Sequence, residues 1–183
     1  YIEGGWPGAN PTDTEFFNKK HPFNHSILTA FGMTKKSDHS AENDPMISSL
    51  INSKANSICL FGKSWDFHVD VALGISKDQN LKNISESAKH IINSGKEFMF
   101  DAEHFFDGYK SNKEYALSCI KSAYDQGARW IILCDTNGGT LPHEISKIVS
   151  DVSKHIPGKN LGIHAHNDTE NAVANSLVAI QAG

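Results

Sequence analysis

Trp130-Ile131-Ile132-Leu133-Cys134 is a nearly unbroken apolar run, and the fold of the whole chain can be worked out from it. A strand with one solvated face alternates apolar and polar residues, whereas a parallel strand covered on both faces reads as a continuous apolar run. After a polar break, apolar residues recur at helical spacing at Ile145, Ile148 and Val149. Pro157-Gly158 then ends the pattern. The segment therefore predicts a strand followed by a helix, which is the unit of a parallel α/β sheet.

The same succession of apolar run, polar break and helical stripe recurs along the chain. Three stretches have the sequence of a helix N-terminal cap, namely Thr12-Asp13-Thr14-Glu15, Ser76-Lys77-Asp78-Gln79 and Ser111-Asn112-Lys113-Glu114. Six strands with helical crossovers imply that the strands run parallel. The other five apolar runs lie at 1–4, 27–31, 57–61, 97–100 and 161–163.

Two architectures fit this pattern, a doubly wound open sheet and a (β/α)8 TIM barrel. Scaling six units in 183 residues up to eight gives about 244 residues, close to the roughly 250 of a typical barrel. The chain also begins within an apolar run and stops where a helical pattern ends. We therefore predict a partial TIM-barrel domain over residues 1–183, with about units two to seven present and units one and eight missing. Two open sheet edges would make such a piece behave poorly in isolation.

Composition excludes several classes of function. A net charge of -4 and a hydrophobic content of 39% describe a globular protein with no general attraction to nucleic acid or to a membrane surface. No run is long enough to span a membrane, and the first residues do not have the pattern of a signal peptide. The three cysteines are widely spaced without a CxxC pair, which favours a reducing, cytoplasmic setting.

The run at 161–163 leads into His164-Ala165-His166. Residues two apart on a strand point the same way, so the two imidazoles are expected side by side at the strand end. Paired imidazoles are common ligands of divalent transition metals, and we predict that His164 and His166 bind one metal ion. The alternative is that one or both are surface histidines or hydrogen-bonded core histidines.

Other polar residues follow the remaining runs, at the strand ends where α/β proteins gather their functional groups. Asp101 and Glu103 are again two apart, so both are expected to face the same side as base, metal ligand or substrate contact. Asp135 and Thr136 follow the same logic more weakly. The turn 138–140 is interpreted either as an anion site at a helix start or simply as a turn.

Lys63 offers a different chemistry. A lysine at a barrel strand end can form a Schiff base with a carbonyl substrate when its pKa is depressed. The two histidines argue against this reading, because a Schiff-base enzyme does not need them. His68 and His104 are interpreted as surface or structural residues.

Five motifs together resemble the catalytic barrel of the isopropylmalate synthase, homocitrate synthase and citramalate synthase family, within the DRE-TIM metallolyases. The resemblance spans essentially all 183 residues, and the first three motifs are most similar to the (R)-citramalate synthase branch. The motifs are Tyr1-Ile2-Glu3-Gly4-Gly5-Trp6-Pro7-Gly8, Phe61-Gly62-Lys63-Ser64-Trp65-Asp66, Asp101-Ala102-Glu103-His104-Phe105-Phe106-Asp107-Gly108, Leu133-Cys134-Asp135-Thr136-Asn137-Gly138-Gly139-Thr140 and Gly162-Ile163-His164-Ala165-His166-Asn167-Asp168.

This resemblance implies a condensation of acetyl-CoA, as co-substrate, with an α-keto acid, here pyruvate, to give (R)-citramalate and CoA for isoleucine biosynthesis. A divalent metal (Mn, Mg, Zn or Co) would chelate the keto acid and polarise its carbonyl. His164 and His166 match the two metal-binding histidines of the family. Glu103 matches the glutamate of the Asp-Arg-Glu signature, near the substrate and its proton transfers. Thr136 matches a substrate-contacting threonine, and Asp101 occupies a substrate-facing position.

The departures from the family pattern are equally informative. The Asp-Arg pair after the first barrel strand, the Asn that completes the metal site after the eighth, and the regulatory region that completes the site across a homodimer have no counterpart in this sequence. Two of four expected protein ligands are present, so this piece alone is expected to be inactive. Alternatives for the whole protein are a 2-isopropylmalate or homocitrate synthase, a metal-dependent hydroxyacyl-CoA lyase, a Schiff-base aldolase using Lys63, or a non-catalytic binding protein.

Overall fold

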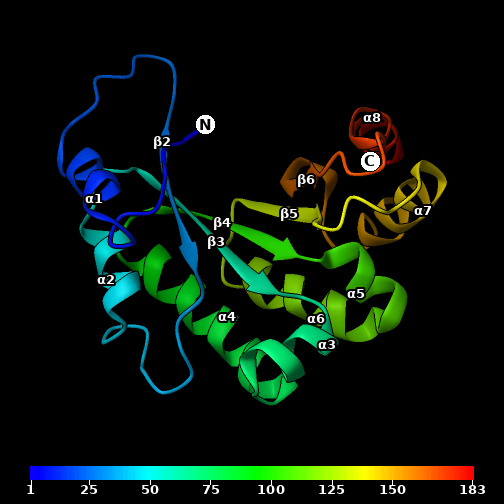
Figure 1. Cartoon of the computed structure of the whole chain (residues 1–183), viewed down its shortest axis with the longest axis horizontal. Helices are drawn as coiled ribbons and strands as arrows, with labels where there is room; N and C mark the ends of the chain where they lie inside the picture. Colours follow the sequence, from blue (N-terminus) through cyan, green and yellow to red (C-terminus); the bar gives the residue numbers. More distant parts are fainter.

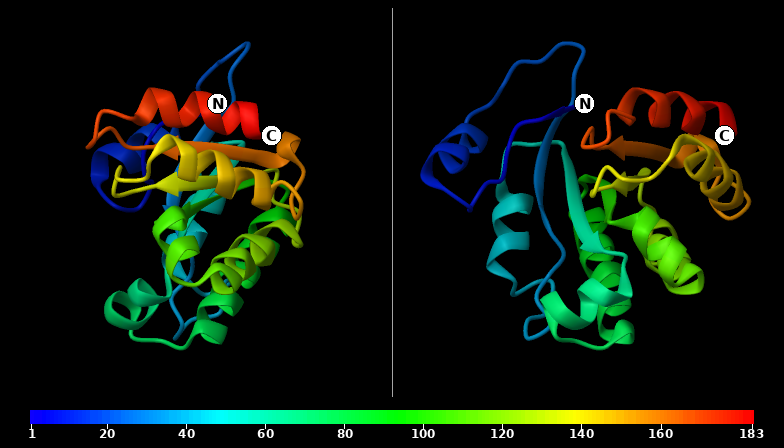
Figure 2. Two further views of the ribbon diagram at one scale, coloured as in Figure 1. Left: turned by 90° about the vertical axis from the view of Figure 1, so that its right-hand side faces the viewer. Right: turned by 45° about the vertical axis from the view of Figure 1, so that its right-hand side comes forward.

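The six apolar runs form the six strands of one parallel sheet in the computed structural model, which describes residues 1–183 (Figure 1). The spatial order of the strands is their order along the chain, so each crossover leads to the adjacent strand. In a doubly wound sheet the order in which successive strands are added reverses at a switch point, and this sheet has no such point. The sheet curves with its helices on the outside (Figure 2), which confirms the prediction of a partial barrel. The strands are β1 (Ile2–Glu3), β2 (Leu28–Met33), β3 (Ser57–Lys63), β4 (Glu97–Glu103), β5 (Trp130–Asp135) and β6 (Leu161–Ala165).

Helices and single turns connect the strands. None of the helices combines the length and the apolar character needed to cross a membrane. They are α1 (Pro11–Asn18), α2 (Pro45–Asn52), α3 (Asp66–His68), the π-helical turn η1 (Val69–Leu73), α4 (Lys77–Asn93), α5 (Phe105–Ser111), α6 (Lys113–Tyr124), α7 (Pro142–Val152), the short 3-10 turn η2 (Gly158–Asn160) and α8 (Ala172–Ala182).

Side chains alternate between two faces of the sheet with different roles. On β3 and β4, Leu60 and Phe100 point outward toward the helices and are fully buried in a core cluster of 32 residues. Their neighbours Phe61 and Asp101 point to the concave inner face and lie opposite each other in register. The outer face therefore stabilises the fold, and the inner face is left for polar groups.

The strands extend beyond the apolar runs that predicted them. The register of β3 and β4 continues through Phe61↔Asp101 and ends at Lys63↔Glu103. The backbone ladder is indifferent to side-chain polarity, and every second residue here faces the open inner surface rather than the core. The last residues of these strands can therefore be polar and still pair with the neighbouring strand.

Helix starts follow local capping chemistry, with two corrections. The cap predicted at Thr12 is wrong: α1 begins at Pro11, and the Asn10 side chain accepts a hydrogen bond from the Asp13 amide at 2.8 Å. Proline fits the first helical position, so the helix starts earlier than the Thr–Glu spacing indicates. The Ser76 cap is confirmed by its hydrogen bond from the Gln79 amide. The cap predicted at Ser111 is wrong by one residue: Ser111 still belongs to α5, and the Asn112 side chain caps α6 by accepting a hydrogen bond from the Tyr115 amide at 3.2 Å.

Candidate active site at the carboxyl ends of the strands

The inner face carries a group of polar side chains where β1, β3, β4, β5 and β6 end. Their position follows from alternation along each strand, since every second residue up to the strand end faces inward. The group comprises Glu3, Lys63, Asp101, Glu103, Thr136, His164 and His166.

Glu103 is held from two sides by the end of β3. Its carboxylate forms an ion pair with the ammonium of Lys63, the residue directly opposite in register. Its backbone carbonyl accepts hydrogen bonds from the Ser64 hydroxyl at 2.7 Å and from the Ser64 amide at 3.2 Å. Gly108 makes this junction possible, because a Cβ there would collide with the Ser64 carbonyl oxygen. The sequence predicts Glu103 in the site, whereas its partners follow only from the register between β3 and β4.

Asp101 links the acidic and imidazole parts of the site. One carboxylate oxygen lies 3.8 Å from His164 Nδ1, and the other accepts a hydrogen bond from the Cys59 thiol at 3.3 Å. The neighbouring Asp101 carboxylate raises the pKa of His164, against the effect of burial. Burial, followed by the charge of Asp101, raises the pKa of Glu3. Three ionisable side chains from β1, β4 and β6 thus influence one another across the concave face.

Potential metal ligands meet at the same place. Possible ligand atoms of Asp101, Cys134 and His164 all lie within 4.8 Å of one another. Burial raises the pKa of the Cys134 thiol well above its usual value, which leaves the carboxylate and imidazole as the better donors. The His166 ring stacks on that of His164 with centroids 4.9 Å apart and planes at 15°. Two imidazoles beside a carboxylate are a donor set that fits a divalent metal, although His166 is not within the three-residue group.

Thr136 is fixed by the residue that follows Glu103. The His104 amide donates a hydrogen bond to the Thr136 hydroxyl at 2.9 Å, and His104 adopts a left-handed backbone conformation with φ 54°. The His104 ring contacts His68 edge to face at 4.4 Å between centroids. Burial lowers the pKa of His68, and the charges of His104 and Lys63 act in the same direction. The two rings therefore pack against each other near Glu103, whose charge also acts on His68.

Asp135 does not belong to this group. It is fully buried, and its carboxylate accepts hydrogen bonds from the Thr140 hydroxyl at 2.8 Å and the Thr140 amide at 3.3 Å. The Thr140 carbonyl in turn accepts a hydrogen bond from Asn175. Since Asp135 already occupies the polar groups of Thr140, the turn 138–140 is a structural turn, and an anion would find these donors in use.

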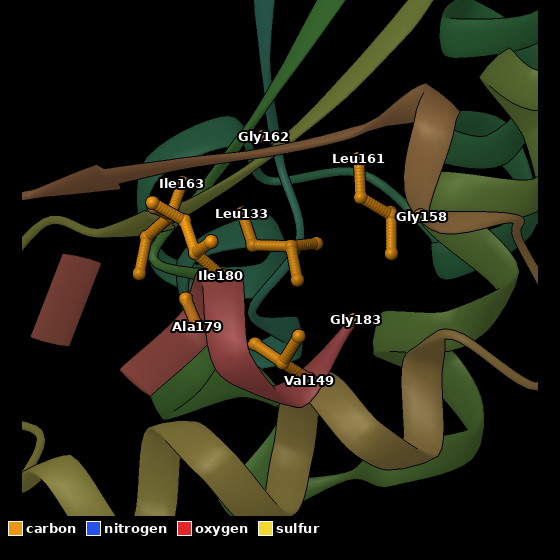
Figure 3. Close-up of a pocket in the computed structure, with 9 residues that line it drawn as sticks. All are labelled: Leu133, Val149, Gly158, Leu161, Gly162, Ile163, Ala179, Ile180 and Gly183. Atoms are coloured by element: carbon orange, nitrogen blue, oxygen red, sulfur yellow. The ribbon is translucent and has the colours of Figure 1, made fainter. Parts of the chain in front are cut away.

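A cavity of about 210 Å³ lies apart from the group of polar side chains, between strands β5 and β6 and helices α7 and α8 (Figure 3). Its walls are almost entirely apolar, so it provides no group for proton transfer or metal binding. The residues that line it are Leu133, Val149, Gly158, Leu161, Gly162, Ile163, Ala179, Ile180 and Gly183.

Comparison with known proteins places the chain among a well-defined set of relatives. The sequence matches the HMGL-like family over residues 1–183. The (R)-citramalate synthase of Aquifex aeolicus (strain VF5) is 52% identical over all of this chain and 35% of its own length. The corresponding enzyme of Geobacter sulfurreducens is 48% identical with the same coverage. The chain thus spans about a third of the length of these relatives.

Solved structures with a similar fold are more distant in sequence. The hydroxymethylglutaryl-CoA lyase from Pseudomonas aeruginosa superposes with a TM-score of 0.77 at 13% identity, over 94% of this chain and 56% of the lyase. The lyase from Brucella melitensis gives the same TM-score at 14% identity, over 94% of this chain and 59% of the lyase. At this identity the likeness supports the barrel fold and nothing further.

Proposed function

The chain belongs to the HMGL-like family, and on this premise we propose that the intact protein is an (R)-citramalate synthase. It would join acetyl-CoA and pyruvate and, with one water, release (R)-citramalate and CoA. One observation carries this proposal: five (R)-citramalate synthases are 43% to 52% identical along the entire chain. A 2-isopropylmalate synthase is only 28% identical over the same residues. Homocitrate synthases reach 31% and 32% over about 70% of the chain.

The metal-binding role falls to His164 and His166. A divalent ion (Mn, Mg, Zn or Co) bound there would polarise the keto carbonyl as a Lewis acid. Asp101 is close enough to His164 to orient its ring, as a carboxylate does for many metal-ligating histidines. The other two protein ligands predicted from the family would come from βα units that pair with the free edges of β1 and β6.

The remaining inner-face residues would bind the keto acid and handle protons. The Thr136 hydroxyl accepts a hydrogen bond from the His104 amide, and it would donate its own proton to a substrate oxygen. Asp101 would face the substrate from β4. Glu103 would serve in proton transfer, for which a carboxylate must be held at a defined position. A homodimeric assembly, a cytoplasmic location and a place in isoleucine biosynthesis are part of the same proposal.

A keto-acid panel tests this function. The purified intact protein would be assayed for CoA release from acetyl-CoA with pyruvate, 2-oxoisovalerate and 2-oxoglutarate, and the products would be identified by chiral chromatography. We expect kcat/KM with pyruvate to exceed that with the other two keto acids by about 100-fold or more. A keto acid whose side chain does not fit the binding pocket typically loses a few kcal/mol of transition-state binding. EDTA should abolish activity, and added Mn²⁺ should restore it. Preference for a larger keto acid, or thioester cleavage without condensation, would assign the protein to a different branch.

A further inference from the structure

Lys63 ends β3 on the inner face, directly opposite Glu103 on β4. The two side chains form an ion pair, and the exposed fraction is only 19% for the Lys63 side chain and 23% for the Glu103 side chain. Both charges are therefore largely withdrawn from water. Their attraction is stronger in this less polar environment than that of a surface pair. The usual explanation of a weak, solvated surface contact does not fit this pair.

The charges around Glu103 explain why a cation is needed there. Asp101 lies two residues earlier on the same strand and faces the same side. Glu3 is close enough to Asp101 for that carboxylate to raise its pKa. Three carboxylates thus share the concave face, and their mutual repulsion would push Glu103 away without a compensating charge.

Lys63 is itself held in place. Its ammonium lies 5.8 Å from the centroid of the Phe61 ring, two residues earlier on the same face. That ring stacks on Phe31 of β2 with centroids 5.5 Å apart. An aromatic face attracts the ammonium, and a stacked pair of rings forms a firm support for it. The Lys63 ammonium is consequently held at one position.

We infer that Lys63 is a positioning residue that fixes the Glu103 carboxylate for its proton transfers. The inference rests on the proposed synthase function and assigns to Lys63 a role that differs from Schiff-base chemistry. An ammonium engaged with a carboxylate has no lone pair with which to attack a carbonyl carbon, so Lys63 acts through Glu103 rather than on the substrate.

The test is a double-mutant cycle in the intact protein with Lys63→Met, Glu103→Gln and their combination. Lys63→Met keeps most of the length of the side chain and removes its charge. We expect kcat to fall about 10- to 100-fold, a part of what general acid–base catalysis contributes, while KM for pyruvate stays within about threefold. Lys63→Arg should recover part of kcat. In the Glu103→Gln background, Lys63→Met should change kcat by less than about twofold.

Lys35→Met is the matched control, because it also removes a buried lysine from an ion pair, with Glu86 at 3.1 Å, outside the site. It should change thermal stability and leave kcat within about twofold. Crystal structures of the wild-type protein and of Lys63→Met provide a readout that needs no activity. We expect the Glu103 carboxylate to move away from its wild-type position when the ammonium is lost.

Several results overturn the inference: an unchanged kcat in Lys63→Met, losses that add in the double variant, an unmoved Glu103 carboxylate, or a Lys63 adduct trapped by borohydride with pyruvate. An inactive wild-type protein would instead refute the synthase proposal, and the two crystal structures would still decide whether Lys63 positions Glu103.

Discussion

Asp101 of β4 and His164 of β6 approach to 3.8 Å although β5 lies between their strands. In a flat sheet two strand spacings would separate them by roughly 10 Å. The curvature of the half-barrel brings their side chains together above β5, where the Cys134 thiol lies within 4.8 Å of both. The concave face thus converts residues from non-adjacent strands into one site.

Asp101→Asn tests whether this contact supports metal binding. Loss of the carboxylate beside His164 should weaken the affinity for Mn²⁺ about 10-fold, as for other partners of metal-ligating histidines. His164→Ala and His166→Ala should each weaken it more strongly. Binding would be measured by calorimetry on the metal-free intact protein. Asp38→Asn is a fitting control, because Asp38 pairs with His39 at 2.7 Å on the exposed surface. An affinity equal to wild type in His166→Ala would remove that residue from the metal site.

Gly108→Ala probes the junction that holds Glu103. The new Cβ would collide with the Ser64 carbonyl oxygen, which belongs to rigid backbone. We expect the free energy of unfolding to fall by about 1–3 kcal/mol, as for other overpacked sites, together with a lower kcat. Urea unfolding followed by circular dichroism gives the first quantity. Gly139→Ala, where the added Cβ meets nothing within 4 Å, should change stability by less than about 0.5 kcal/mol.

The Asp151 ion pairs predict a dependence of stability on pH. Hydrogen bonds from Lys113 and then Tyr109 lower the pKa of Asp151 below its usual value of 3.8. A lowered folded-state pKa stabilises the protein above the unfolded-state pKa, and this stabilisation is lost as pH falls through the folded-state pKa. The difference in Tm between wild type and Asp151→Asn should therefore be full at pH 6 and shrink below about pH 4. Asp125→Asn, at the exposed end of α6, should show no such change.

The three buried thiols should be chemically silent in the folded protein. Burial raises the pKa of Cys119 to about 12, and those of Cys59 and Cys134 also rise well above their usual value. Since the thiolate is the reactive form, we expect no alkylation of these residues by iodoacetamide at pH 8. Mass spectrometry before and after unfolding in urea would read this out. Rapid labelling of Cys134 in the folded state would mean that the inner face opens far more than the structure indicates.

The sequence predicted all six strands because each overlaps a short run set off by polar breaks, and the number and spacing of these units indicated the class of fold. It also placed His164 and His166 together, since strand alternation is a local property. Asp135 was harder to place. The run predicted at 130–134 does not tell which face the next residue takes, and the structure turns Asp135 outward to Thr140 and Thr136 inward.

The contacts of Glu103 lay beyond local patterns. Lys63 and Glu103 are far apart in sequence, and only the register between β3 and β4 brings them face to face. Register depends on the packing of both strands against the helices, which no short motif encodes. The hydrogen bond from the His104 amide to Thr136 likewise depends on the left-handed backbone of His104, which the local sequence does not predict.

The alternation of outer and inner residues along the strands also bears on how such a protein can change over evolution. Outer residues such as Leu60 and Phe100 carry the hydrophobic core, whereas their neighbours Phe61 and Asp101 contribute little to it. A mutation on the concave face can therefore alter which substrate is accepted with only a small loss of folding free energy. Selection for a new activity and selection for a stable scaffold act on different residues of the same strand.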